Sequence, residues 1–203
     1  MKWWRLYRAD MKRYRTLRPR HPMLVIWWTE QGLWALLQYR LASGIYYSWW
    51  PRFLKAPLLG VMVLWQVVIE VLTKISLPYR ARIGPGLYIG HCGPLVLNPD
   101  VIIGRDCNLS QVTTIGISGM GEKRGVPIIG DRVFIGPHTL ILGPISIGDD
   151  AVIGGGSVVV RSVPPHVTVA GNPAKQVSEQ GSAGYVVLAG QAPPPLPFRE
   201  DWS

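Results

Sequence analysis

Four histidines and two cysteines are the side chains of this chain best suited to act as a base or a nucleophile near neutral pH. His91 and Cys92 are adjacent and lie directly at a break in a repeating pattern. A histidine can take up and release a proton near neutral pH, so His91 is a candidate general base. A covalent role for Cys92 is less favoured, because neighbours on a strand face opposite sides. The two cysteines lack the paired spacing of a zinc site, and we expect no metal.

The elements that must position these residues follow from a six-residue repeat in the second half of the chain. Its uninterrupted part is Ile129, Ile135, Ile141, Ile147, Ile153 and Val159, and most of these are followed by glycine. Each glycine would cost a helix about 1 kcal/mol, whereas short strands joined by tight corners accept it. The repeat therefore predicts a hexapeptide β-solenoid. Breaks after Ile89 and after Ile115 predict loops, and the second loop holds residues 117–127.

The segment 1–82 differs in composition from the rest of the chain. It contains 14 of the 21 Lys and Arg residues and three acids, a net charge of +11, whereas the remainder carries −2. Eight of the nine tryptophans lie before residue 66. Proline positions and apolar runs predict helices near 3–17, 22–43 and 53–75. The two parts of the chain are therefore expected to do different work.

Bases and aromatic rings alternate over the segment 1–20, a pattern that suits an anionic membrane surface. A solvated basic helix beside a core of packed tryptophans is the alternative. Pro57, Gln66 and Glu70 interrupt the longest apolar run, which falls short of the roughly 20 residues of a spanning helix. Nucleic acid is not an expected partner, because the positive charge does not extend into the second half.

Six stretches carry motifs of one known family: residues 31–40, 83–91, 108–116, 153–160, 163–166 and 170–174. On these motifs the chain resembles the serine acetyltransferase branch of the left-handed β-helix hexapeptide acyltransferases, over about residues 22–177. The resemblance implies an α+β fold, with a helical part followed by a left-handed parallel β-helix. We expect the helical part over 1–78, the β-helix over 79–175, and a flexible Pro-rich tail over 176–203. The resemblance also implies a homotrimer that binds acetyl-CoA in a groove beside the coil.

The same resemblance implies roles for individual residues. His91 matches the family's catalytic histidine, which would take the proton of an acceptor hydroxyl as the oxygen attacks the thioester. The residues that match positions beside acetyl-CoA are Gly116, Gly136, Pro137, Gly155 and Lys175. The residues assigned to the acceptor are Arg124 and Asn98.

Departures from the family pattern fall largely on groups that hold serine's ammonium. Gly90 stands where the family has an acid directly before the histidine, and Gly125 stands where it has a second histidine. Ser76 stands where the family has another acid, which is thought to orient the imidazole. In a looser match, the pair His21-Pro22 replaces an Asp-Pro. A Gly-His together with the later pair Asn98-Pro99 is similar to relatives from exopolysaccharide and capsule pathways, which are thought to acetylate a sugar hydroxyl.

The sequence thus predicts an acetyl-CoA-dependent O-acetyltransferase acting on a sugar hydroxyl of an exopolysaccharide or capsule precursor. Serine O-acetylation in cysteine biosynthesis is one alternative, and a non-catalytic trimeric β-helix scaffold is another. No secretory signal is recognisable, so we expect a cytoplasmic protein that associates peripherally with the inner face of the membrane through its N-terminal part.

Overall fold

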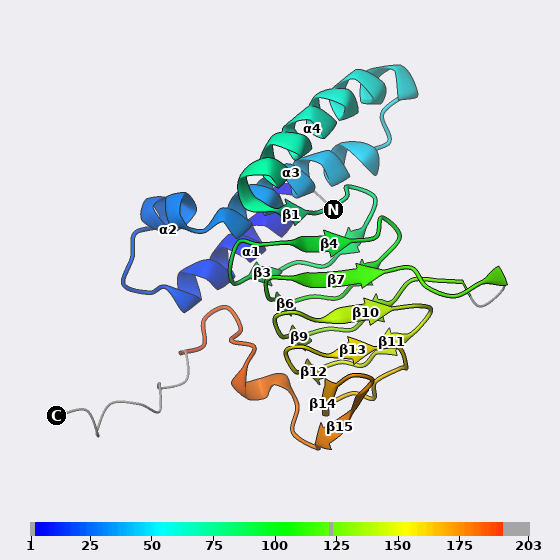
Figure 1. The fold of residues 1–203 in the computed structure, drawn as a ribbon. Helices are drawn as coiled ribbons and strands as arrows, with labels where there is room; N and C mark the ends of the chain where they lie inside the picture. Colours follow the sequence, from blue (N-terminus) through cyan, green and yellow to red (C-terminus); the bar gives the residue numbers. More distant parts are fainter. Residues whose placement is uncertain (1–2, 122–123, 193–203) are drawn as a thin grey trace.

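The computed structural model describes residues 3–121 and 124–192, which form four helices followed by a coil of short strands (Figure 1). The helices are α1 (Trp3–Leu17), α2 (Met23–Thr29), α3 (Gln31–Tyr46) and α4 (Arg52–Thr73). The helix predicted over 22–43 is in fact two helices. Glu30 has an extended backbone (φ −101°, ψ 90°) and separates α2 from α3. Residues at this break line a pocket that also contains His91.

The strands form a parallel β-helix of about five turns. Their bounds are β1 (Ile75–Ser76), β2 (Arg82–Ile83), β3 (Tyr88–Ile89), β4 (Leu95–Leu97), β5 (Ile102–Ile103), β6 (Asn108–Leu109), β7 (Thr113–Gly116), β8 (Ile128–Ile129), β9 (Phe134–Ile135), β10 (Leu140–Leu142), β11 (Ser146–Ile147), β12 (Val152–Ile153), β13 (Val158–Val159), β14 (Thr168–Gly171) and β15 (Ala174–Ser178). In Figure 1 the front strands run to the right and the chain returns behind them as it descends, which makes the coil left-handed.

Three sheets form the faces of the coil. The front sheet has the order β1-β4-β7-β10-β13, the second β11-β8-β5-β2, and the third β15-β14-β12-β9-β6-β3. The aliphatic residues of the six-residue repeat point into the coil and are all buried. An even period keeps every such side chain on the same face of its strand, which is why the repeat predicts this core. The fold class expected from the sequence is confirmed, with β1 pairing to β4 and so starting the coil at Ile75.

Side chains of the helical part cover the open upper edge of the coil. The Tyr14 hydroxyl donates to the carbonyl of Ile89 and accepts from its N–H, both at 3.0 Å. The Tyr39 hydroxyl donates to the Ala81 carbonyl at 2.8 Å and accepts from the Ile83 N–H at 3.1 Å. Among the described residues β2 and β3 each lie at the end of their sheet, so these bonds satisfy edge groups that the sheet itself does not pair.

A buried ion pair lies where α1 and α3 cover the upper edge of the coil, and these covering helices are here called the cap. Arg40 donates two hydrogen bonds to Asp10, at 2.8 and 3.0 Å, and neither side chain is more than 1% exposed. Asp10 also accepts from the N–H groups of Gly86 and Leu87 at 2.8 and 3.0 Å. The charges are thus fully hydrogen-bonded, as burial requires, and they join α1 and α3 to the first turn of the coil.

The C-terminal segment differs from the free tail expected from residue 176. β15 pairs antiparallel with β14, and Val186 and Val187 are buried. The Ser182 N–H donates to the Asp150 carbonyl at 2.8 Å, and Arg13 Nε donates to the Val187 carbonyl at 3.1 Å. Buried valines and hydrogen bonds such as these pack residues 176–192 against the coil and α1. Residues 193–203, with the Pro-rich run, lie outside the described residues.

Candidate active site

His91 lies in the connection between β3 and β4, where the six-residue repeat is broken. The N-terminus of α3 approaches this connection closely because Gly32 has no side chain. A Cβ at Gly32 would lie 2.9 Å from the Ile89 carbonyl oxygen and would also collide with the Tyr14 hydroxyl. Glycine is therefore required where α3 meets β3, and this contact places the α2–α3 break beside His91.

A pocket of about 140 Å³ opens at this meeting point. Its lining residues are Arg18, Thr29, Glu30, Gln31, Gly32, Ile89, Gly90, His91 and Cys92. Glu30 is 8% exposed, and Arg18 Nη2 lies 3.1 Å from its Oε1 atom. The pocket thus contains a base, a carboxylate and an imidazole within a volume that suits a small polar molecule.

The carboxylate of Glu30 also affects its neighbour Tyr88, whose ring packs against that of Tyr14 with 4.7 Å between centroids. Burial raises the pKa of the Tyr88 hydroxyl, and the negative charge of Glu30 raises it further. Tyr88 therefore stays a neutral phenol beside the pocket. Glu30 is the acidic side chain that lines the pocket.

His91 itself is exposed, and within the described part of the chain its imidazole has no hydrogen-bond partner. Ser76, which stands where the family has an acid, does not serve it. The Ser76 hydroxyl donates to Glu70 Oε1 at 2.6 Å, and Gln66 Nε2 donates to the same oxygen at 2.7 Å. An exposed imidazole with free nitrogens is able to accept a proton from a bound hydroxyl.

The two cysteines have different surroundings. Cys92 is exposed and lies with His91 in a turn, so the expectation that strand geometry turns them to opposite faces does not apply. Both residues line the same pocket. Cys107 is fully buried in the coil, and burial raises the pKa of its thiol to about 12. Over residues 3–121 and 124–192, no cluster of three or more His, Cys, Asp or Glu residues could hold a metal ion.

Three of the residues expected beside the coenzyme share one edge of the coil with His91. This edge is formed by the connections from the third sheet to the front sheet, which include β3–β4, β9–β10 and β12–β13. Gly136 and Pro137 lie in the second of these connections and Gly155 in the third. A Cβ on Gly136 would lie 2.6 Å from the Gly155 nitrogen, so successive corners are closely stacked.

The fourth expected coenzyme residue, Lys175, is exposed at the start of β15. The hairpin before it continues the same edge, because the Gly171 N–H donates to Ser157 Oγ at 3.2 Å. Four strand steps separate β3 from β14, about 19 Å at roughly 4.8 Å per step. The edge that begins at His91 therefore extends about 19 Å before it reaches the hairpin that carries Lys175.

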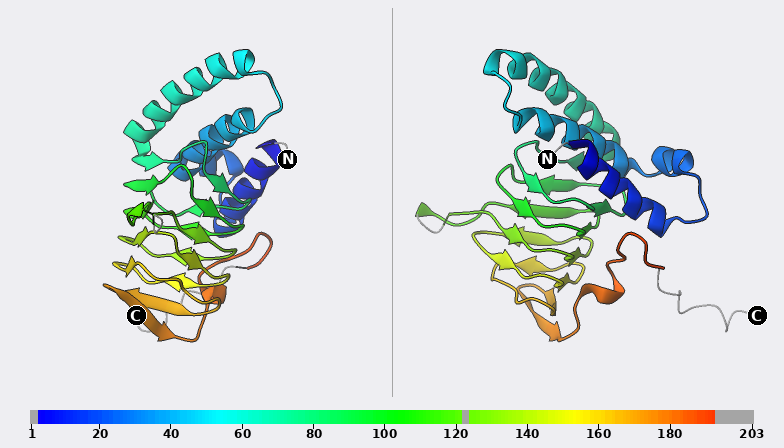
Figure 2. Two further views of the ribbon diagram at one scale, coloured as in Figure 1. Left: turned by 90° about the vertical axis from the view of Figure 1, so that its right-hand side faces the viewer. Right: turned by 180° about the vertical axis from the view of Figure 1, so that it is seen from behind.

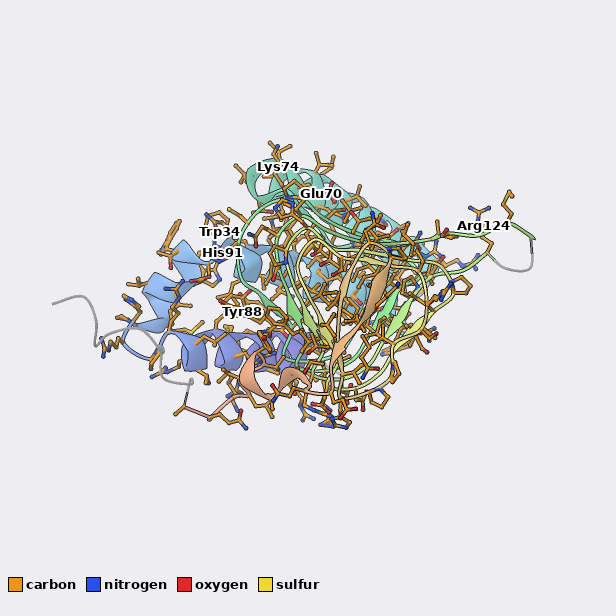
Figure 3. All side chains as sticks on the ribbon, turned by 60° about the horizontal axis from the view of Figure 1, so that its bottom comes forward. Trp34, Glu70, Lys74, Tyr88, His91 and Arg124 are labelled. Atoms are coloured by element: carbon orange, nitrogen blue, oxygen red, sulfur yellow. The ribbon has the colours of Figure 1, made fainter. Side chains whose placement is uncertain are left out.

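Gly116, Asn98 and Arg124 lie elsewhere. Gly116 is the last residue of β7, Arg124 lies in the loop after it, and Asn98 follows β4, all at the edge where the front sheet leads into the second sheet. Asn98 Oδ1 accepts from the Asp100 N–H at 3.0 Å and so stabilises a turn. Figure 3 shows Arg124 on the projecting loop at the side of the coil opposite His91. Within one chain, the structure does not bring these three residues to the histidine.

Arg18 and Glu30 are the pocket residues that the sequence reasoning missed. Glu30 is one of the three acids in the segment 1–82, beside Asp10 and Glu70. Each of these three acids has a specific contact, an ion pair for Asp10 and Glu30 and a hydrogen bond from Ser76 for Glu70. The scarcity of acids in this segment can be seen in the sequence, whereas the position of Glu30 beside His91 is seen only in the structure.

Comparisons with known proteins point to one family. Residues 127–161 match the family described as bacterial transferase hexapeptide (six repeats). The chain is 32% identical over 199 residues to a serine acetyltransferase of Mycobacterium tuberculosis, covering 96% of this chain and 77% of the relative. It is 33% identical over 152 residues to a serine acetyltransferase of Salmonella typhimurium, covering 75% of this chain and 53% of the relative. The chain therefore spans only about half the length of that second protein.

Two solved structures with bound ligands have a similar fold. The serine acetyltransferase of Brucella abortus in complex with coenzyme A has a TM-score of 0.74 and 28% identity, covering 89% of this chain and 69% of that one. The serine acetyltransferase of Neisseria gonorrhoeae in complex with serine has a TM-score of 0.72 and 29% identity, covering 87% and 69%. None of these four proteins is an exopolysaccharide or capsule enzyme, so they do not support that part of the sequence prediction.

Proposed function

Because this chain belongs to the serine acetyltransferase family, we propose that it transfers an acetyl group from acetyl-CoA to the hydroxyl of serine. The observation that carries the proposal is that His91 shares its pocket with the ion pair of Arg18 and Glu30, at the head of the edge that leads down to Lys175. The pocket supplies a base for the hydroxyl and charges of both signs for an amino acid. The edge supplies room for the acetyl donor.

His91 is the proposed general base. A serine hydroxyl is a weak nucleophile at neutral pH, and the imidazole takes its proton as the oxygen attacks the thioester carbonyl. The carbon–sulfur bond then breaks, the new ester remains on the serine, and the imidazolium returns the proton to the departing thiolate. The base is thereby regenerated within one cycle. Such help contributes about 10²–10⁴ in rate.

Arg18 and Glu30 are the proposed acceptor-binding residues. Free serine is a zwitterion, with a carboxylate that matches a guanidinium and an ammonium that matches a carboxylate. The family's acids are absent at Gly90 and Ser76, and Glu30 is a carboxylate that lines the pocket in this chain. Serine would insert between the two side chains and replace their mutual contact with two charge-assisted contacts of its own.

The predicted homotrimer and the predicted role of Arg124 are proposals that support each other. The edge that bears Arg124 and the edge that bears His91 border the same front sheet. A three-fold arrangement in which the 117–127 loop of one chain crosses to the next would bring Arg124 to a neighbouring His91. The projection of this loop away from its own coil supports the arrangement (Figure 1).

A sugar hydroxyl remains the second candidate acceptor, on the ground that this chain lacks several of the groups that hold serine's ammonium in the family. A neutral sugar would make no use of the opposite charges of Arg18 and Glu30, which is why we favour serine. The cytoplasmic location also remains a prediction.

The proposal is tested with the purified full chain, labelled acetyl-CoA, and serine or nucleotide sugars as acceptors. We expect labelled O-acetylserine, and we expect His91→Gln to lower kcat by about 10²–10⁴. His166→Gln is the control, because His166 is an exposed histidine at another corner of the coil and should leave the rate unchanged. Acetylation of the sugars but not of serine would overturn the acceptor assignment. An unchanged rate in His91→Gln would overturn the mechanism.

A further inference from the structure

The outer face of α4 is apolar and uncovered. An 18-residue window of this helix has a mean hydropathy of 1.9, yet only 11% of it is buried. The residues that form the exposed surface, here called the α4 face, range from 39% to 70% exposed and are Leu58, Val61, Leu64, Val68, Val71 and Leu72. Figure 2 shows α4 on the outside of the molecule, at the end of the coil opposite β15. A surface of this kind marks an interaction site.

No charged group interrupts the α4 face between Ala56 and Leu72. Glu70 is the one charged residue in that stretch, and it turns inward to accept hydrogen bonds from Gln66 and Ser76. By length and composition alone α4 could cross a membrane, contrary to the sequence-based expectation. Its opposite side, however, is fixed to the body of the protein, because Gln38 Nε2 donates to the Met62 carbonyl at 3.0 Å and Ile69 is buried. The helix can therefore lie on a surface with its outer face, but it cannot span a membrane without losing these contacts.

Both ends of the α4 face carry bases. Arg52 and Lys55 lie at its start, next to Trp49, which is 90% exposed, and Phe53, which is 75% exposed. Lys74 lies directly after its end and is also exposed. Aromatic rings and bases that flank an apolar helix suit the interface between water and an anionic bilayer.

A second copy of the chain is a poorer partner for this face. Parallel pairing of two α4 helices would place Arg52 and Lys55 against the same bases, and antiparallel pairing would place them against Lys74. The segment 1–82 carries a net charge of +11, so the surroundings add to the repulsion. We propose that the α4 face docks on the surface of a bilayer that contains anionic phospholipid. This proposal does not depend on the acceptor of the acetyl group.

The test is co-sedimentation of the full chain with vesicles of phosphatidylglycerol and phosphatidylcholine, compared with vesicles of phosphatidylcholine alone. We expect binding to the mixed vesicles that weakens as salt is added, and much weaker binding to the neutral ones. Val71→Glu should weaken binding at least about tenfold, because it buries a charge in the apolar contact. Val177→Glu is the matched control, since Val71 and Val177 are both valines that are 63% exposed.

The double change Arg52→Gln with Lys55→Gln should weaken binding to the mixed vesicles only. Unchanged helical circular dichroism of each variant would show that folding is preserved. The proposal is overturned if the wild-type chain does not sediment with mixed vesicles, or if Val71→Glu binds them as the wild type does. It is equally overturned if Val71→Glu lowers the mass in light scattering without affecting vesicle binding. That last result would assign the α4 face to a contact between copies.

Discussion

Each acid of the basic segment 1–82 has a defined partner. Asp10 binds Arg40, Glu30 binds Arg18, and Glu70 accepts from Ser76. Only the pair with Glu30 combines a buried acid with a base that is half exposed, at 49% of the Arg18 side chain. Arg18 is thus free to turn toward a ligand while Glu30 stays in place. This asymmetry distinguishes a binding pair from a structural one.

Glu30→Gln should raise the KM for serine about 10- to 100-fold and leave the KM for acetyl-CoA unchanged. A charge-assisted hydrogen bond contributes about 1.5–3 kcal/mol, and glutamine keeps the shape but not the charge. Initial rates with serine and with 3-hydroxypropionate, which lacks the ammonium, provide the measurement. The wild-type chain should prefer serine, and the variant should lose that preference. Equal preference in both proteins would remove Glu30 from the acceptor site, and Glu179→Gln is the exposed control.

The sequence locates His91 but not the rest of its pocket. His91 is found because a local motif and a break in the repeat coincide at one position. The contact of Gly32 with Ile89 joins residues that are far apart along the chain, and no local pattern encodes it. For the same reason the inward turn of Glu70 toward Ser76 could not be read from spacing.

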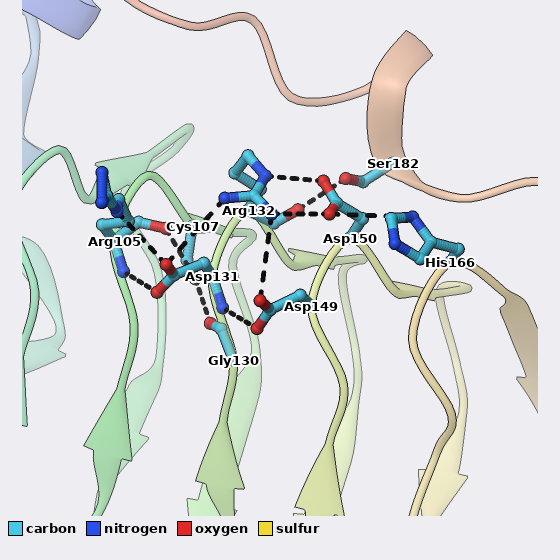
Figure 4. A network of polar contacts seen from close by, with 9 residues as sticks. All are labelled: Arg105, Cys107, Gly130, Asp131, Arg132, Asp149, Asp150, His166 and Ser182. Atoms are coloured by element: carbon cyan, nitrogen blue, oxygen red, sulfur yellow. Dashed lines mark hydrogen bonds and ion pairs between the residues drawn. The ribbon is translucent and has the colours of Figure 1, made fainter.

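At the scale of elements, the corner between the second and third sheets carries a ladder of charges (Figure 4). Arg132 donates from Nε and Nη2 to the two carboxylate oxygens of Asp150, each at 2.7 Å. Arg105 and Asp131 pair at 3.2 Å one turn above, and His166 lies 3.7 Å from Asp150 one turn below. Opposite charges therefore link the turn of Arg105 to that of Asp131 and Arg132, and that turn to the one that carries Asp149 and Asp150.

Asp150→Asn should lower stability at neutral pH by about 1 kcal/mol, or roughly 2–4 °C in Tm. The hydrogen bonds from Arg132 hold the pKa of Asp150 below its ordinary value, and nearby positive charge adds to this. The folded state therefore prefers the charged carboxylate. Its contribution is present above the unfolded pKa of about 3.9 and is lost as the pH falls through the lower folded value.

Urea unfolding of both proteins between pH 7 and about pH 3 measures this difference, which should shrink as the carboxylate is protonated. Asp100→Asn is the control, because Asp100 and Arg80 form a pair at 2.8 Å that is more than half exposed. A difference in stability that stays constant with pH would show that the loss comes from packing and not from the charge of Asp150.

At the scale of the whole molecule, the coil could be predicted and its cap could not. The six-residue period places one aliphatic residue inside every strand, so sequence alone specifies the core of the coil. The cap depends on hydroxyl and guanidinium groups that reach across 42–75 residues of sequence, as Tyr39 does to Ala81 and Tyr14 to Ile89. The packed segment over 176–192 depends on Arg13 in the same way. Such contacts follow from the fold and not from a local pattern.

We expect these contacts to make the helical part and the coil unfold together as one cooperative unit. Variants of two ion pairs test this expectation. Asp10 and Arg40 are buried at 2.8 Å, and Asp100 and Arg80 are exposed at the same distance. Asp10→Ala would leave Arg40 buried without its partner and should cost about 3–5 kcal/mol, whereas Asp100→Ala should cost at most about 1 kcal/mol. Because the apolar core runs from α1 through the coil without interruption, the loss should reach both parts.

Native-state hydrogen exchange read by mass spectrometry separates the two parts. In Asp10→Ala, we expect peptides of α3 and peptides of the coil between residues 128 and 160 to lose protection by similar free energies. Asp100→Ala should change neither set appreciably. Loss of protection in the helices alone, with the coil unaffected, would mean that the cap and the coil unfold independently and that the cap only rests on a self-sufficient solenoid.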